Sequence, residues 1–140
     1  MSTSRYNRMY KRGVKAELEL VYLLWRHGWM VMRGPGSGKR LKKIFYPDVV
    51  AVKDGRVLLF EVKLRKHRDT IHIDEWKVEG YKELARRSSG ECYVAVKVSD
   101  ERKWFFFKLD TLEKQEHKGK TRYVITVNMY DKAIPLYLII

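Results

Sequence analysis

Cysteine and histidine, the residues that cross-link many small proteins through disulfides or a bound metal, are scarce in this chain of 140 residues. Cys92 is the only cysteine, and the four histidines are scattered without the spacing of a metal-binding pair. A single cysteine excludes an internal disulfide framework and a cysteine-based zinc site, and it suits a reducing compartment. We therefore expect a cytoplasmic protein whose fold depends on its hydrophobic core.

Long uncharged apolar segments are also missing. No stretch approaches the roughly 18 consecutive apolar residues of a membrane-spanning helix. The basic start MSTSRYNRMYKRG is not followed by the apolar segment of a secretion signal, and no basic amphipathic helix with a clean apolar face points to a membrane surface. Repeats and low-complexity segments are absent too. With 45% hydrophobic residues, the chain predicts a single domain over residues 1–140.

Acidic residues are outnumbered. The chain has 30 Lys and Arg against 17 Asp and Glu, which gives a formal net charge of +13. Residues 33–43 contain five cations and no acid, and residues 63–68 contain four cations and a histidine. A solvated surface normally mixes both signs, so these clusters favour a polyanionic partner such as nucleic acid. The alternative is a basic soluble protein without such a partner.

Hydrophobic periodicity and turn residues predict a mixed α/β fold. Residues 11–28 predict a helix of about 15 residues that ends near Gly28, and residues 72–90 predict a second helix with Asp74 as its N-cap. The predicted strands cover residues 29–33, 48–53, 56–63, 92–98, 103–109, 121–130 and 134–140.

The strongest local signal is the Asp-Gly dipeptide at residues 54–55, between two β-branched runs. It predicts a two-residue hairpin with a type I′ turn. Counting outward from such a turn without a bulge places Asp48 opposite Glu61, with their Cβ atoms ~4.5–5.5 Å apart. Lys63 lies two residues further along on the same face.

Like charges directly opposite each other destabilise a sheet unless a cation lies between them. Lys63 could supply part of this positive charge. Mg²⁺ would be a better cation at this position, because it prefers one or two carboxylates, several waters and phosphate oxygens as ligands. The alternative is that Asp48 and Glu61 are ordinary residues near strand ends, with Glu61 and Lys63 as an ion pair. The opposite face of the hairpin is predicted to be core and carries Val49, Ala51, Phe60 and Val62.

Glu17 is a third candidate carboxylate, because it falls on the apolar stripe of the first predicted helix. An unpaired buried carboxylate is costly. The residue therefore reaches solvent at the edge of the stripe, pairs with a lysine such as Lys15 or Lys63, or points into the same metal site.

The glycine-rich loop GPGSGK at residues 34–39 invites comparison with a phosphate-binding P-loop. The comparison fails, because Arg33 stands where the first glycine is needed and Arg40 stands where Ser or Thr is needed. As a backbone nest the loop could still touch a phosphate. Ser37 is then either a turn residue or a hydrogen-bonding partner of a DNA backbone or a metal-bound water.

The residues around the hairpin carry a family resemblance. YPDVV (46–50) and FEVKLRK (60–66) resemble the PD-(D/E)xK nuclease signature. Residues 10–38 and 79–97 resemble the corresponding segments of archaeal Holliday junction resolvases. The resemblance covers roughly residues 10–98 and is poor over the C-terminal 40 residues. One departure is Leu18, where the family often has arginine, and this removes a candidate DNA contact.

The resemblance implies a restriction-endonuclease-like core, with a mixed central β-sheet flanked by helices. It also implies a homodimeric, Mg²⁺-dependent endodeoxyribonuclease that resolves four-way DNA junctions by paired symmetric nicks in homologous recombination and repair. Glu17, Asp48 and Glu61 match the metal carboxylates, Lys63 matches the residue that orients the attacking water or stabilises the transition state, and Ser37 matches a catalytic-loop serine. The candidate DNA-binding residues are Lys11, Arg12, Arg33, Lys39, Arg40, Lys42, Lys43, Arg65 and Lys66.

Other functions stay open at this point. A different PD-(D/E)xK nuclease, acting on duplex, flaps or ends, would share the metal motif. A non-catalytic architectural DNA-binding protein would bind without cutting, although the intact set of Asp48, Glu61 and Lys63 disfavours it. Charge alone does not distinguish DNA from RNA. For the dimer surface, the candidates are the second helix and the apolar tail AIPLYLII.

Overall fold

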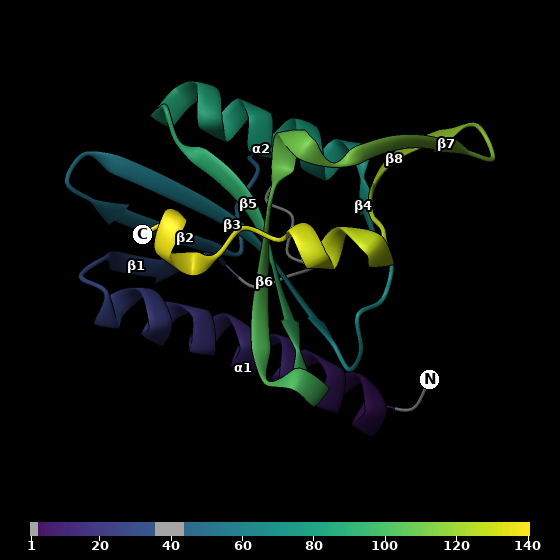
Figure 1. Ribbon diagram of the computed structural model, residues 1–140, viewed down its shortest axis with the longest axis horizontal. Coiled ribbons are helices and arrows are strands. Elements are labelled where there is room, and N and C mark those ends of the chain that lie inside the picture. Colours follow the sequence, from purple (N-terminus) through teal and green to yellow (C-terminus); the bar gives the residue numbers. More distant parts are fainter. Residues whose placement is uncertain (1–2, 36–43) are drawn as a thin grey trace.

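The computed structural model of the protein describes residues 3–35 and 44–140. A five-stranded sheet has the strand order β1-β2-β3-β5-β6, and a three-stranded sheet has the order β4-β8-β7. Helix α1 (Thr3–Arg26) runs along one side of the larger sheet and α2 (Glu75–Ser88) along the other (Figure 1). The predicted mixed sheet flanked by helices is confirmed.

The hairpin forms in the predicted register. Strand β2 (Val49–Lys53) pairs antiparallel with β3 (Arg56–Arg65), and β1 (Met30–Arg33) pairs antiparallel with the other edge of β2. Asp54 and Gly55 have φ values of 49° and 80°. Positive φ at both central residues is the mark of the type I′ turn.

A crossover connection makes β3 a central strand. The chain passes through β4 (Ile71–Asp74) and α2, and β5 (Glu91–Val98) then pairs parallel with β3. Strand β6 (Lys103–Lys108) pairs antiparallel with β5 and completes the sheet. Asp74 stands at the predicted N-cap position of α2, but its side chain makes no capping hydrogen bond.

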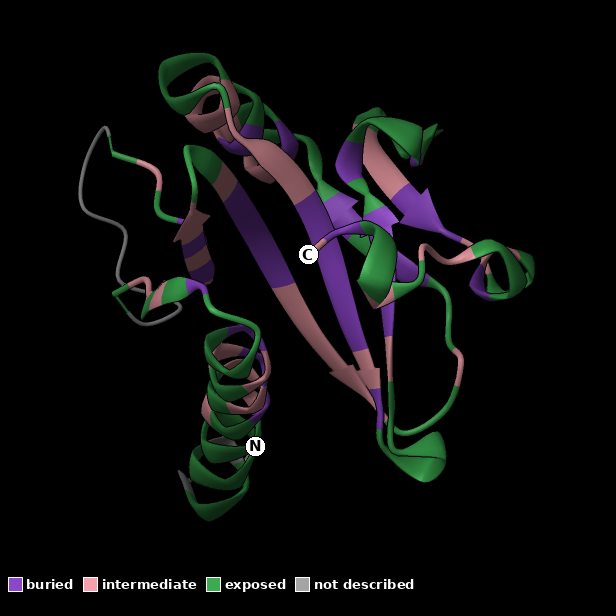
Figure 2. Cartoon of the chain, turned by 60° about the vertical axis from the view of Figure 1, so that its left-hand side comes forward, coloured by how far each residue is buried: buried purple, intermediate pink, exposed green. Residues whose placement is uncertain are grey.

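Both faces of the central strands are buried (Figure 2). On the α1 side, Phe60 packs in a cluster with Leu20 of the helix. On the α2 side, Leu59 packs in a second cluster with Val78 and Tyr81. Helices on both faces explain why these strands are nearly continuous apolar runs. The predicted core face of the hairpin is confirmed, but the face that carries the carboxylates is buried as well.

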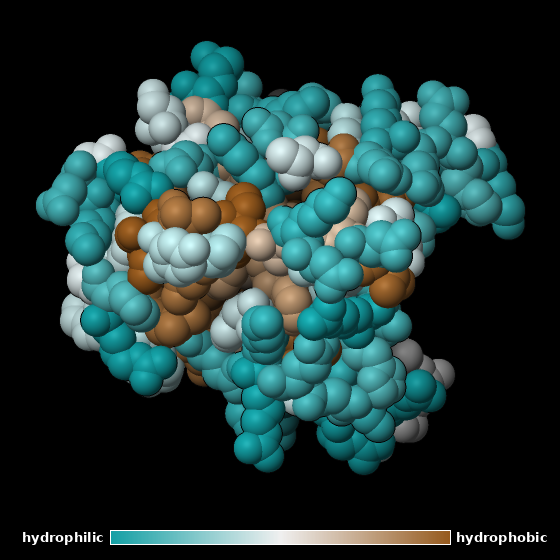
Figure 3. All heavy atoms as spheres, viewed as in Figure 1, coloured by the Kyte–Doolittle hydropathy of each residue, from teal (hydrophilic) through white to brown (hydrophobic). Residues whose placement is uncertain are grey.

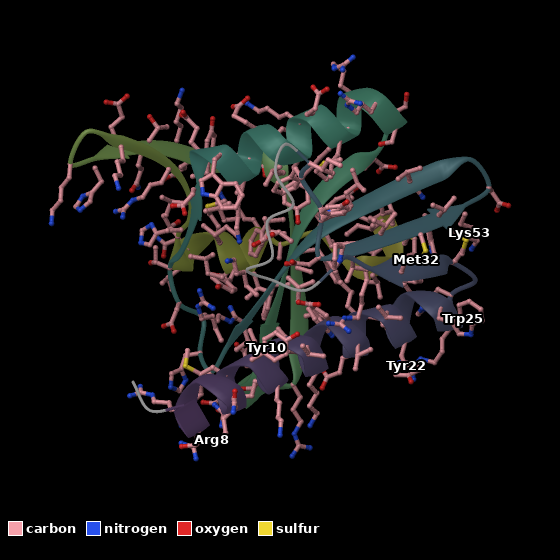
Figure 4. The ribbon with its side chains drawn as sticks, turned by 180° about the vertical axis from the view of Figure 1, so that it is seen from behind. Arg8, Tyr10, Tyr22, Trp25, Met32 and Lys53 are labelled. Atoms are coloured by element: carbon pink, nitrogen blue, oxygen red, sulfur yellow. The ribbon has the colours of Figure 1, made fainter. Side chains whose placement is uncertain are left out.

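Helix α1 is longer than predicted. It begins at Thr3 rather than near residue 11, and it ends two residues before Gly28, which has a φ of 90°. No proline or glycine in residues 3–10 interrupts helix formation. The side chains described in the first turns of the helix, those of residues 4, 5 and 7–12, are exposed (Figure 2). Tyr22 and Trp25 lie on the outer surface near the other end of the helix, 65% and 63% exposed (Figure 4).

The second sheet and the C-terminal segment differ most from the prediction. Strands β4 and β7 (Glu113–His117) were not predicted, and both pair with β8 (Lys120–Ile125). The predicted strand over residues 121–130 is correct only as far as Ile125, because a 3₁₀ helix follows at Val127–Lys132.

The predicted strand over residues 134–140 is wrong. Ile134 makes a single bridge to Phe106, and Leu136–Leu138 is a short 3₁₀ helix after Pro135. Proline has no N–H with which to continue a ladder. The segment is still apolar, because Ile139 is fully buried in the core cluster on the α1 side of the sheet. Within the described residues, no helix is long and apolar enough to cross a membrane.

Candidate active site

The two carboxylates of the hairpin lie where its ladder begins. Val49 pairs with Phe60 as the last pair of the ladder, so Asp48 directly precedes the paired region and does not form the predicted ladder pair with Glu61. The Asp48 N–H donates to the Phe60 carbonyl at 3.1 Å, and the Val62 N–H donates to Asp48 Oδ2 at 2.8 Å. The side chain of Asp48 thus continues the hydrogen bonding of the sheet beside Glu61.

Glu61 is a buried charged residue, with 3% of its surface exposed. Two ammonium groups contact its Oε2 atom, that of Lys63 at 3.3 Å and that of Lys77 at 3.0 Å. The Tyr81 hydroxyl lies 2.9 Å from Glu61 Oε1 and 2.9 Å from the Phe60 carbonyl oxygen. The ion pair between Glu61 and Lys63 was part of the alternative interpretation of the sequence, whereas Lys77 and Tyr81 reach the site from α2 and were not predicted.

These contacts shift the pKa values of the two carboxyl groups in opposite directions. Burial and the charge of Glu61 raise the pKa of Asp48 to about 7, and the hydrogen bond from Val62 opposes them only in part. Burial alone would raise the pKa of Glu61 as well. The ammoniums of Lys63 and Lys77 outweigh that effect and lower it. Of the two carboxyl groups, Asp48 is therefore the one that takes up a proton first as pH falls.

The donor set fits a hard divalent cation. Asp48 and Glu61 offer carboxylate oxygens, and burial and the charge of Glu61 raise the pKa of Asp48, so a cation beside Asp48 would be favourable. Mg²⁺ is commonly held by one or two carboxylates, with waters and substrate phosphate oxygens completing its shell. Over residues 3–35 and 44–140, however, no three His, Cys, Asp or Glu residues converge as a metal-binding group.

Glu17 has a different partner. Its Oε1 atom accepts a hydrogen bond from Arg33 Nε at 3.1 Å, and its side chain is 12% exposed. Neither Lys15 nor Lys63, the lysines considered from the sequence, forms this ion pair. Burial raises the pKa of Glu17, Arg33 opposes the rise, and the charge of Glu61 adds to it. Glu17 is thus within electrostatic range of the hairpin carboxylates, and its role as a metal ligand stays a prediction.

Comparisons with known proteins agree on one family. The model described as "Archaeal holliday junction resolvase (hjc)" matches residues 8–140. The chain belongs to this Hjc family. The match extends through the C-terminal segment, where the sequence resemblance was expected to be poor.

Relatives named "Crossover junction endodeoxyribonuclease Hjc" support the assignment. That of Sulfurisphaera tokodaii is 35% identical over 125 residues, which cover 89% of this chain and 83% of the relative. That of Sulfolobus acidocaldarius is 37% identical over 105 residues, which cover 75% and 71%. The structure of Archaeoglobus fulgidus Hjc, "a Holliday junction resolvase from an archaeal hyperthermophile", superimposes with a TM-score of 0.76 at 27% identity, covering 91% of this chain and 94% of that one.

Of the glycine-rich loop at residues 34–39, which contains the serine matched to the family's catalytic loop, the structure describes only residues 34 and 35. Ser37 and the cations Lys39, Arg40, Lys42 and Lys43 lie outside the described residues, so their roles stay predictions. Its first residue, Gly34, donates its N–H to the Asp48 carbonyl at 2.9 Å. A Cβ atom on Gly34 would collide with the Pro47 carbonyl oxygen. Glycine is therefore needed here for a close approach of the backbone that holds the loop against Asp48.

A basic groove of about 740 Å³ lies between α1 and the ends of β3 and β5. Its lining includes Arg12, Arg65 and Lys66, three of the residues predicted to bind DNA, and it adds Lys15 and Lys97, which were not predicted. Lys63 also lines the groove, and it connects the groove to Glu61. Asp48 and Glu61 themselves are not part of the lining. Lys11 is exposed on α1 but does not line the groove.

The sequence contains a weak signal for the two unpredicted residues. Lys77 and Tyr81 are four positions apart in a predicted helix, and this spacing places them on one face. Nothing in the sequence determines that this face meets Glu61, since the crossover from β3 to β5 brings them together.

Proposed function

We propose that this chain is a Mg²⁺-dependent endonuclease that resolves four-way DNA junctions by paired symmetric nicks, acting as a cytoplasmic homodimer in homologous recombination and repair. The observation that carries the proposal is the placement of Asp48 and Glu61 side by side, with Lys63 on the same carboxylate, in a member of the Hjc family.

Asp48 and Glu61 would hold the cation, which supplies a water of lowered pKa and neutralises charge on the phosphoryl oxygens when it is bound. Lys63 holds its ammonium 3.3 Å from Glu61 Oε2, where it can orient the attacking water and stabilise the charge that develops on the phosphate. The Tyr81 hydroxyl of α2, which lies 2.9 Å from Oε1, restricts the rotamers that Glu61 can adopt. Asp48 must be ionised to hold a metal, so its pKa of about 7 makes metal binding weaker in acid.

The groove supports DNA as the substrate. Phosphates are neutralised by lysine and arginine, and such contacts position a backbone without reading its sequence. One acid, Glu19, is found among the described residues that line the groove, and Lys97 lies 3.5 Å from it. This arrangement suits recognition of DNA shape rather than of bases.

The homodimer is supported by an exposed apolar surface at the C-terminal segment. Tyr137 and Leu138 are 74% and 66% exposed, and apolar atoms gather around this end of the chain (Figure 3). The other candidate surface, α2, instead carries exposed ion pairs such as Lys82 with Glu79 and Arg86 with Glu83. We therefore favour the C-terminal segment as the contact between copies, which would space two active sites for two cleavable strands.

The test is cleavage of a labelled synthetic four-way junction in Mg²⁺, beside a linear duplex of the same sequence. We expect paired symmetric nicks in the junction alone, and loss of cleavage both in EDTA and in the Asp48→Asn variant. Asp54→Asn is the matched control, because it removes the same charge at an exposed position of the hairpin turn. Equal cutting of the linear duplex would point to a different PD-(D/E)xK nuclease. Tight binding without cutting would point to an architectural protein.

A further inference from the structure

Glu61 makes three polar contacts before any metal binds. Lys77 and Lys63 contact Oε2, the Tyr81 hydroxyl contacts Oε1, and the side chain is 4% exposed. A cation that took Oε2 as a ligand would have to occupy space where an ammonium group lies. Binding of the metal through Oε2 therefore requires that a lysine leave this oxygen.

The two lysines are not equally placed to leave. Lys63 belongs to β3, two residues from Glu61, and its side chain is 21% exposed. Lys77 is in the first turn of α2, and its side chain is 31% exposed. The positive end of a helix dipole lies at its first turn, which disfavours a cation there. Lys77 nevertheless makes the shorter contact with Oε2, 3.0 Å against 3.3 Å for Lys63, and the charge of Asp48 also attracts it, so its ammonium is the more direct competitor of a metal at that oxygen.

The charge balance points the same way. With both carboxylates ionised, Lys63 and Lys77 already neutralise the site. Adding a divalent cation while both lysines stay would place two uncompensated positive charges beside a buried carboxylate, which is costly. A DNA phosphate would give the displaced Lys77 ammonium a new anionic partner.

We infer that Lys77 is a positioning residue that competes with the divalent metal for Glu61 and releases it when a DNA phosphate binds. Metal loading is then coupled to DNA binding, and by reciprocity bound metal tightens DNA binding to the same degree. The inference rests on the proposed function in one respect, because it takes Asp48 and Glu61 as the metal-binding carboxylates.

The test measures metal binding directly, without catalysis. Mn²⁺, which takes the same oxygen ligands as Mg²⁺, is titrated into DNA-free protein at pH 8, and the free ion is followed by electron paramagnetic resonance. Lys77→Met and Lys77→Gln should bind Mn²⁺ about tenfold more tightly than the unmodified chain, because a charge-assisted contact no longer opposes the metal. Lys77→Arg should not gain affinity. Lys82→Met is the matched control, since it removes the same charge from an exposed position of α2.

A second titration adds linear duplex, which supplies phosphates without the junction. Duplex should tighten Mn²⁺ binding by the unmodified chain, and this gain should be largely lost in Lys77→Met. Circular dichroism confirms folding, and the glutamine variant replaces the methionine variant if the latter does not fold.

The outcomes separate this inference from the proposed function. If Asp48→Asn abolishes Mn²⁺ binding but both Lys77 variants bind like the unmodified chain, the metal site stands and the role of Lys77 is refuted. Weaker binding in both Lys77 variants also refutes competition, because Lys77 would then support the site. Absence of saturable Mn²⁺ binding in every protein would overturn the proposed metal-dependent function.

Discussion

Replacing Asp48 with asparagine should stabilise the metal-free protein at alkaline pH, although it removes a residue assigned to catalysis. Asparagine keeps an oxygen that can accept the hydrogen bond from the Val62 N–H, now made by Asp48 Oδ2 at 2.8 Å. The substitution removes a negative charge that burial and the neighbouring charge of Glu61 make unfavourable in the folded chain. An active-site charge of this kind lowers stability in exchange for function.

The magnitude follows from the pKa of Asp48, which is about 7 in the folded chain against an ordinary value of 3.8. Because the folded pKa is the higher one, the stability associated with protonation is complete below about pH 4 and is lost as pH rises through about 7. The difference between the two pKa values lowers the free energy of unfolding by at most about 4 kcal/mol at pH 8, and by roughly half as much at pH 5. The variant also gives up attraction to Lys77, so we expect a net gain of about 1–3 kcal/mol at pH 8.

Urea denaturation in EDTA, followed by tryptophan fluorescence, measures the free energy of unfolding at pH 5 and at pH 8. The advantage of Asp48→Asn over the unmodified chain should be larger at pH 8. Saturating Mg²⁺ should shrink or reverse this advantage, because a ligand that binds only the folded protein stabilises it and the variant lacks a ligand group. Asp54→Asn, exposed in the hairpin turn, should show no such dependence on pH or on Mg²⁺.

The reasoning is refuted if Asp48→Asn is less stable than the unmodified chain at pH 8 without metal. It is also refuted if the stability difference is the same at both pH values. Either result would mean that the Asp48 carboxylate is adequately compensated in the folded protein and does not need an added cation.

Three further predictions concern the cleavage chemistry, DNA binding and the backbone around the site. Lys63→Met should lower single-turnover cleavage by roughly 10²–10⁴-fold while the junction still binds in gel-shift assays, because one group that stabilises the transition state is lost. Lys66→Ala should weaken junction binding and reduce the slope of log K against log salt by about 1, whereas Lys114→Ala, exposed on β7, should leave the slope unchanged. Gly34→Ala should lower the urea midpoint by an amount equivalent to roughly 2 kcal/mol or more, because its Cβ would collide with the Pro47 carbonyl oxygen.

Each of these predictions has a result that would contradict it. Unchanged cleavage by Lys63→Met would remove this lysine from the mechanism. An equal change in salt slope for Lys66→Ala and Lys114→Ala would show that net charge, rather than the groove, governs binding. A Gly34→Ala protein as stable as the unmodified chain would show that the loop can shift without cost.

Local features made much of the site predictable. The Asp-Gly turn fixes a two-residue hairpin, and once the turn is fixed the register follows by counting, so the pairing as far as Val49 and Phe60, the residues next to Asp48 and Glu61, could be derived from the sequence. The parallel partner of β3 was consistent with a helix between two strands. Helix α1 was predicted by its apolar stripe, but its start was missed because its exposed first turns carry no such stripe.

Long-range contacts explain part of the errors. Strand β4 is short and pairs with β8 across a large sequence separation, so its identity depends on a neighbour that the sequence does not place. Strand β7 instead forms a local hairpin with β8 around Lys118 and Gly119, and it was missed because its residues are polar on both faces. The C-terminal residues are as apolar as a strand, yet Pro135 and packing against the core give a 3₁₀ turn instead.

By itself, the sequence determined the charge of the molecule, the hairpin and the register of its two strands, because turn chemistry and strand alternation act over a few neighbouring residues. Only the tertiary structure decided which cations those carboxylates meet. Lys77 and Tyr81 reach Glu61 because the crossover lays α2 over β3, and Glu17 meets Arg33 because α1 packs beside β1. These choices depend on how helices pack across a sheet, and side-chain spacing along the chain does not encode them.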